Sequence, residues 1–181
     1  MKTALVNGIL LNGFENMQPE NGLAILIEND KIADIIPQNE VEDDCEKIDL
    51  NGQYVMPGLI NMHVHLAGSG KPQKKQRDNE KLVKTIMGSS LTRAIAYKMV
   101  CGFARDELMS GVTTIRTVGG LGNFDTRLRN EINNGEKIGP RILAANEGIS
   151  VPGGHMAGSV AIAAHNINEA LAHLEKCKDE N

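Results

Sequence analysis

The chain has 181 residues, of which 41% are hydrophobic and 23% charged, an ordinary balance for a globular protein. Its formal net charge is −4, and this excludes the excess of lysine and arginine that a nucleic-acid partner requires. Widely spaced cysteines and the lack of a long apolar run predict a protein of the reducing cytoplasm with no membrane partner.

Residues 1–57 read as short strands separated by turns of Asn, Asp and Gly, which accept positive backbone φ angles. The stretch ILIENDKIADII has two β-branched runs around Asn29–Asp30 and predicts a hairpin. The sequence therefore predicts a small β domain in this part of the chain. The predicted strands are residues 4–6, 9–11, 23–27, 32–36 and 47–50.

From residue 58 the pattern changes to strands alternating with helical segments. A nearly continuous apolar run at 58–66 predicts a strand covered on both faces, and β-branched residues predict further strands at 112–118 and 141–145. Helical spacing predicts a helix over 91–109, capped by Ser90, and another over 166–177, capped by Asn166. A polar segment with helical turns lies at 124–133. This alternation predicts an α/β fold with a parallel sheet and right-handed crossovers.

Two histidines, His63 and His65, stand one residue apart at the end of the first of these strands. Successive side chains of a strand point to opposite faces, so both imidazoles share one face with Asn61, while Val64 takes the other. Two imidazoles about 6.5–7 Å apart along a strand can converge on one cation. The alternative is that one histidine is a hydrogen-bonded core residue and the other is exposed. His165 and His173 are expected on the surface of the last helix.

Four segments of the sequence carry a more specific resemblance. The run MPGLINMHVHL at 56–66 resembles the first-strand signature of the amidohydrolase superfamily, PGLID-x-H-x-H. The segment SGVTTIRTVGG is similar to the second strand, GVTTVRDVGG, and GPRILAANEGISVPGGHM to the third strand and loop of prolidase-like members. The residues before MPGL resemble the β-sandwich segment that precedes the barrel in this superfamily. An imidazolonepropionase-related branch fits as well.

The resemblance implies a β-sandwich segment at 1–57, followed at 58–181 by the first three βα units of a TIM-type (β/α)₈ barrel. It implies a metal-dependent hydrolase that cleaves amide, cyclic amide or dipeptide C–N bonds of small molecules with a metal-activated water. His63 and His65 map onto the metal-binding pair, with one or two divalent cations, most often Zn²⁺. His155 maps onto a substrate-binding histidine at the barrel mouth. Arg116 faces either the substrate or a structural ion pair.

The sequence departs from the superfamily pattern at three positions. Asn61 and Thr117 stand where aspartates are usual, and Met156 replaces a glycine. Three of eight βα units also leave the fourth-strand ligand, two later histidines and the catalytic aspartate to be expected beyond residue 181. We therefore expect the chain to be inactive alone and to pair its open edges in a homo-oligomer or with a missing C-terminal half. The alternative is a catalytically inactive half-barrel that acts as a binding or assembly module.

Overall fold

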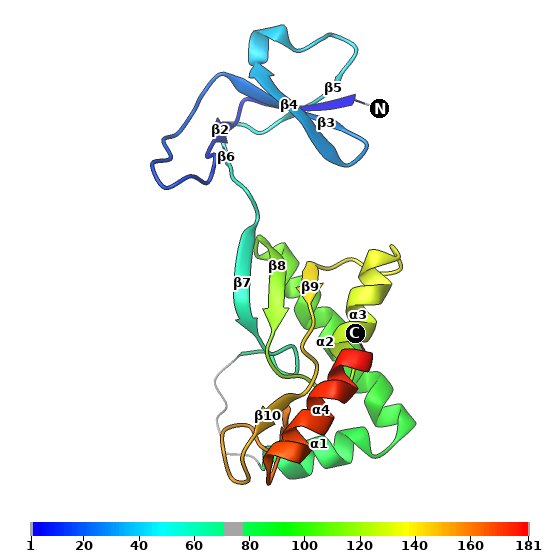
Figure 1. Cartoon of the computed structure of the whole chain (residues 1–181). Helices are drawn as coiled ribbons and strands as arrows, with labels where there is room; N and C mark the ends of the chain where they lie inside the picture. The colour runs from blue at the N-terminus through cyan, green and yellow to red at the C-terminus, as the bar shows by residue number, and fades with distance from the viewer. Residues whose placement is uncertain (1, 71–77, 181) are drawn as a thin grey trace. The chain divides into compact units, whose positions relative to one another are not determined.

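The computed structural model describes residues 2–70 and 78–180 (Figure 1). The chain forms two compact units, Met1–Pro57 and Gly58–Asn181. The first is rich in sheet and the second mixes helices with a parallel sheet, so the fold is mixed α/β, as the sequence predicts. Within the described ranges, none of the helices combines the length and apolar character that crossing a bilayer demands.

The first unit contains a four-stranded sheet of order β4-β3-β1-β5. Strand β1 pairs antiparallel with β3 and parallel with β5. The predicted hairpin is confirmed, because β3 and β4 pair antiparallel around Asn29 and Asp30, whose φ angles are +48° and +67°. The bounds are β1 Lys2–Val6, β3 Leu23–Glu28, β4 Lys31–Pro37 and β5 Glu46–Asp49, with η1 Gln38–Glu40 and a short pair β2 Ile9–Leu10 and β6 Tyr54–Val55.

The second unit is built on the predicted parallel sheet, in the order β7-β8-β9. The strands are β7 Leu59–Val64, β8 Val112–Thr117 and β9 Arg141–Leu143. Gly58 has to be glycine, because a Cβ there would lie 2.1 Å from the hydroxyl oxygen of Thr113. The missing side chain at Gly58 thus allows the start of β7 to lie close to β8. A second parallel pair, β10 Gly148–Ser150 and β11 Ala161–Ala163, follows β9.

The described residues of this unit form four helices: α1 Asn79–Met87, α2 Ser90–Met109, α3 Phe124–Asn133 and α4 Ile167–Asp179 (Figure 1). Helix α1 was not expected from the sequence; Asp78 caps it by accepting from the Lys81 amide. Ser89, rather than the predicted Ser90, caps α2. The predicted cap of α4 is confirmed, because Asn166 Oδ1 accepts from the Glu169 amide at 3.0 Å.

The core of this unit lies between the sheet and helices α2 and α3. Helix α2 contributes Ala96, Tyr97, Val100 and Ala104, and small side chains allow it to approach β8 closely. The Tyr97 hydroxyl donates to Glu131 on α3 at 2.6 Å and so joins the two helices. The other fully or nearly buried apolar residues of this core are Val64, Leu66, Ile115, Leu121, Phe124, Leu128, Ile142 and Val160.

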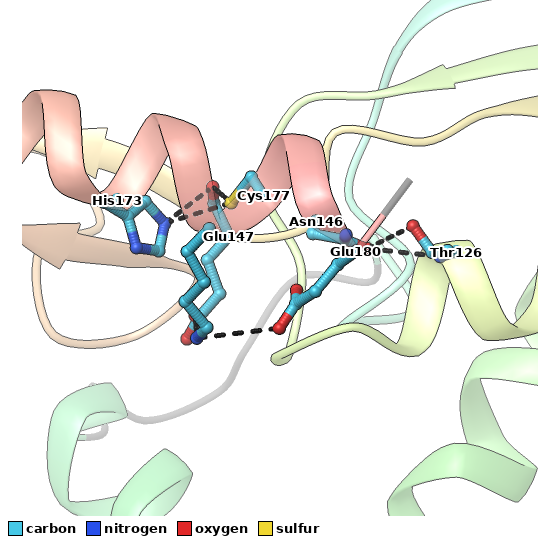
Figure 2. A network of polar contacts seen from close by, with 7 residues as sticks. Thr126, Asn146, Glu147, His173, Cys177 and Glu180 are labelled. Atoms are coloured by element: carbon cyan, nitrogen blue, oxygen red, sulfur yellow. Dashed lines mark hydrogen bonds and ion pairs between the residues drawn. The ribbon is translucent and has the colours of Figure 1, made fainter.

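The expectation that His173 lies on the surface is wrong. Its side chain is only 8% exposed, and its Nε2 lies 3.4 Å from both the Cys177 sulfur and the Glu147 carbonyl oxygen (Figure 2). His173 and Cys177 are four residues apart, so both face the segment after β9. Burial raises the pKa of the Cys177 thiol, as expected for a packing residue. His165, by contrast, is exposed as predicted.

We expect Leu128→Ala to lower the free energy of unfolding by about 2–5 kcal/mol, because Leu128 is 1% exposed and its truncation leaves a cavity. The matched control is Leu91→Ala on α2, where the side chain is 70% exposed and the change should stay within about 0.5 kcal/mol. Urea unfolding followed by circular dichroism measures both. Equal effects of the two substitutions would contradict this assignment of the core.

Candidate metal-binding site

His63 and His65 lie at the C-terminal end of β7 with their imidazole rings side by side. The ring centroids are 5.2 Å apart and the planes meet at 74°. Val64 points the other way and is buried in the core, at 7% exposure, and Leu66 in the turn that follows is 1% exposed. Packing of Val64 therefore fixes the face on which His63 stands.

An irregularity in β7 shapes the backbone directly before the histidines. The register against β8 shifts between Asn61 and Val64, so the regular ladder is interrupted there. The Asn61 side-chain oxygen accepts from the His63 amide at 3.2 Å. Arg116 Nε donates to the Met62 carbonyl at 2.9 Å. Two side chains thus hydrogen-bond the backbone groups of the bulge, and Arg116 has a structural partner in β7.

His65 is oriented by the turn that follows β8. Its Nδ1 lies 3.0 Å from the Gly119 carbonyl oxygen, and because a carbonyl only accepts, Nδ1 carries the proton. The Nε2 lone pair then remains available to a cation. This is the arrangement of metal-binding histidines, whose second nitrogen donates to a carbonyl or carboxylate.

A cavity of about 650 Å³ opens beside the two histidines. Leu66 and Leu121 give it apolar walls, and Ser159 and Glu107 add polar groups. A concave, mostly apolar space with a few polar groups is typical of a small-molecule site. Arg116 and His155 do not line this cavity, so the structure brings together only two of the four site residues singled out in the sequence.

His155 is exposed in the segment between β10 and β11. The next residue, Met156, lines the cavity and has a φ of +62°, a conformation that is rare for a residue with a side chain of this size. The superfamily pattern has glycine here, and glycine adopts positive φ freely. The Met156 carbonyl accepts from the Ser159 hydroxyl at 2.7 Å, which holds the turn.

Asp125 is a buried carboxylate near the site that sequence reasoning missed. It is 1% exposed in the first turn of α3, and the Thr117 hydroxyl donates to it. Burial raises the pKa of Asp125 to about 6 from 3.8, although the Thr117 hydrogen bond and the nearby His65 oppose this rise. Thr117 itself accepts from the Ala145 amide at 3.0 Å. The carboxylate absent at position 117 is therefore supplied next to it by α3.

The residues present fit the first part of a metal site. Imidazole nitrogens suit zinc and similar divalent cations, and the neighbouring rings of His63 and His65 offer two candidate ligands. Within the described residues, no third histidine, cysteine or carboxylate completes a group with them. A separate group in the first unit, Glu42, Asp44 and Cys45, has ligand atoms within 4.8 Å of one another. It combines two exposed acids with a core cysteine and has no histidine.

Comparison with protein families gives two matches that together cover nearly the whole chain. The model of the amidohydrolase family matches residues 54–180, and that of the NagA composite domain matches residues 4–55. A 5-methylthioadenosine/S-adenosylhomocysteine deaminase of Bacillus thuringiensis (strain Al Hakam) is 42% identical over 73 residues, which are 38% of this chain and 16% of the deaminase.

Solved structures resemble the chain along its full length. An Xaa-Pro dipeptidase with methionine in its active site is 27% identical with a TM-score of 0.73, covering 100% of this chain and 45% of the dipeptidase. A prolidase complexed with N-methylphosphonate-L-proline has a TM-score of 0.79 at 20% identity, covering 100% of this chain and 45% of the prolidase, and indicates the fold alone. The chain thus spans less than half the length of these relatives.

Asp125 should make stability fall as the pH rises from about 4 to 6. A carboxyl group whose pKa is raised by folding binds its proton more tightly in the folded state. Its contribution to the free energy of unfolding is therefore complete below the unfolded-state pKa of 3.8, and it is lost as the pH passes the folded-state pKa of about 6. Relative to Asp125→Asn, the free energy of unfolding of the wild type should fall by up to about 3 kcal/mol across this pH range. Urea unfolding between pH 3.5 and 7 measures the difference, with Asp125→Ala as a second reference that should give the same slope. A difference independent of pH would contradict the shift.

Proposed function

Since the chain belongs to the amidohydrolase family, we propose that residues 58–181 carry the first two ligands, His63 and His65, of a metal site that hydrolyses C–N bonds in small molecules. The observation that carries this proposal is that the two imidazoles lie side by side, with ring centroids 5.2 Å apart, at the C-terminal end of a parallel strand. Ligand sites of α/β folds lie at this end of their strands. The names of the relatives, a deaminase and a dipeptidase, both describe C–N bond cleavage.

We also propose the architecture in which this site works. The first 57 residues form part of a β-sandwich, and β7, β8 and β9 with their helices are the first three βα units of a TIM-type (β/α)₈ barrel. The parallel order β7-β8-β9 and the full-length likeness to the dipeptidase support this assignment. In such a barrel the strand ends that carry His63, His65 and Thr117 face the active site.

A divalent cation, for which zinc is our first choice, would supply an activated water at neutral pH and polarise the bond to be cleaved. The residues of this chain orient the two histidines and surround the substrate. His65 offers Nε2 because its Nδ1 proton is held by Gly119. Asn61 and Arg116 hold the bulge that carries His63. The apolar walls of Leu66 and Leu121 exclude water around a small substrate.

We propose that the complete site needs further ligands from outside these 181 residues. Two imidazoles are one short of the three protein ligands that a catalytic zinc usually has. His155 and Arg116 remain candidates for substrate contacts, because each is exposed on a segment that follows or forms a strand of this unit. On this proposal the substrate is a small amide, dipeptide or related amine, and the enzyme works in the cytoplasm.

His63→Ala and His65→Ala should each weaken Zn²⁺ binding by at least about tenfold, or about 1.4 kcal/mol, because each removes one of two converging ligands. Isothermal titration of the 181-residue chain with Zn²⁺ measures this. His165→Ala is the matched control, since that imidazole is exposed on the approach to α4 and should leave binding unchanged. Binding that survives the loss of both histidines would contradict the metal site.

Turnover is the second test of the proposal. With Zn²⁺ present, we expect no metal-dependent hydrolysis of Xaa-Pro dipeptides or 5-methylthioadenosine by this chain alone, because the ligand set is one short. Release of proline or ammonia that a chelator abolishes would show instead that the 181 residues hold a complete site. If Zn²⁺ binding is independent of His63 and His65 and turnover is absent, the binding or assembly alternative is favoured.

The exposed strands support self-association. Strands β7 and β9 are the two edges of their sheet, and the apolar side chains of Leu59, Ile60, Met62 and Leu143 are 48–64% exposed. Unpaired apolar edges invite pairing with another chain. We expect sedimentation velocity to give a homo-oligomer that Ile60→Lys shifts toward monomer, with Ile138→Lys, at an exposed position between α3 and β9 and outside every strand, as control. A monodisperse wild-type monomer would contradict this expectation.

A further inference from the structure

We propose that Asp125 is a positioning residue for the metal ligand His65 and acts on it through the Gly119–Gly120 turn. The inference rests on the proposed function, since it assigns His65 to a cation. Asp125 is 1% exposed in the first turn of α3, 60 residues after His65 in the sequence. The turn after β8 lies against both side chains.

The glycine turn contacts both side chains through adjacent residues. Gly119 accepts the Nδ1 proton of His65 at 3.0 Å, and a Cβ on Gly119 would lie only 3.2 Å from that nitrogen. A Cβ on Gly120 would lie 2.7 Å from Asp125 Oδ2. The imidazole therefore lies against one glycine of the turn and the carboxylate against the other. A shift of the carboxylate is therefore passed to the carbonyl that orients His65.

The carboxylate is itself held from the sheet. The Ala145 amide after β9 donates to the Thr117 hydroxyl oxygen at 3.0 Å, and Thr117 at the end of β8 donates its proton to Asp125. A hydroxyl has one proton, so the bond from Ala145 leaves that proton to the carboxylate. Asp125 is thus connected to the ends of two strands and cannot turn away from the glycines without breaking this chain of hydrogen bonds.

The second carboxylate oxygen suggests what Asp125 is for. Asp125 Oδ2 is buried and, among the described residues, has no hydrogen-bond partner. A buried acceptor without a partner costs stability and calls for an explanation. A negative charge at this place stabilises a positively charged or metal-bound imidazole more than a neutral one. Carboxylates in the surroundings of metal-binding histidines have this effect on ligand orientation and basicity.

A purely structural role is the alternative, because an acid in the first turn of a helix also interacts with the helix dipole. The structure offers a matched control for it. Thr126, the next residue, donates its amide and hydroxyl to Asn146 Oδ1, both at 3.1 Å, and so ties the same helix end to the residues after β9 (Figure 2). This contact does not involve the glycine turn. Thr126→Val therefore weakens the junction of α3 without disturbing the path to His65.

The experiment compares the chain with Asp125→Asn and Thr126→Val in two measurements at pH 7.5. Asparagine keeps the shape and the acceptor for Thr117 but removes the charge. We expect Asp125→Asn to weaken Zn²⁺ binding about 10- to 100-fold with no fall in the metal-free melting temperature. Thr126→Val should lower the melting temperature and leave Zn²⁺ affinity within about twofold of wild type. Affinity unchanged in Asp125→Asn would overturn the proposal, as would a parallel loss of affinity and melting temperature in both variants.

A metal-free readout separates this proposal from the proposed function. Long-range ¹H–¹⁵N spectra of the imidazoles, assigned with His65→Ala, report which nitrogen of His65 carries the proton. We expect the Nδ1–H form in wild type and Thr126→Val, and a mixture of both forms in Asp125→Ala, which removes the contact with Gly120. If Zn²⁺ binding does not depend on His63 and His65, the proposed function fails, and the tautomer still decides whether Asp125 positions His65. An unchanged Nδ1–H form in Asp125→Ala would refute the positioning role.

Discussion

The hydrogen bond from His65 Nδ1 to the Gly119 carbonyl is the contact around which the rest of this unit is arranged. It requires the ends of β7 and β8 to lie side by side, and the parallel register of the two strands provides this. It also requires a turn without side chains, since a Cβ at Gly119 or Gly120 would collide with His65, Asp125 or the Val160 carbonyl. Gly119 and Gly120 are therefore needed because they leave room for His65 to be oriented correctly, and not only because they form the turn.

Much of the fold follows from local pattern. The period-two and period-3.6 spacing of apolar residues, with their turn and capping residues, predicted the hairpin at Asn29–Asp30, the parallel strands and α4. Helix α1 was missed because it directly precedes α2, with only Gly88 and Ser89 between them. The sequence also did not predict which side of α2 is buried. The apolar residues Leu91, Ile95 and Met99 are more than half exposed, while Ala96 and Ala104 are buried. Which ridge is buried depends on how closely the helix approaches the sheet.

For the site, the sequence indicated the pair on β7 because a strand has a fixed alternation. It could not indicate Asp125, which comes from a different element and reaches the site only through the packing of α3 against the strand ends. His173 was misjudged for a related reason. Its helical position looks exposed until the segment at Glu147 folds over it. Residues brought together by tertiary packing leave no periodic signal in one sequence.

The three residues that depart from the superfamily pattern share one property, which is that each takes part in the hydrogen bonds or the turn beside the histidines. Asn61 keeps an oxygen that accepts from the His63 amide, as an aspartate would, but carries no charge. Thr117 passes a hydrogen bond from Ala145 to the carboxylate of Asp125. Met156 adopts a positive φ, which a glycine would adopt freely, at a conformational cost of about 1–2 kcal/mol. The hydrogen-bonded framework around His63 and His65 thus has two fewer carboxylates than the superfamily pattern supplies, which gives the buried charge of Asp125 a larger share of the local field.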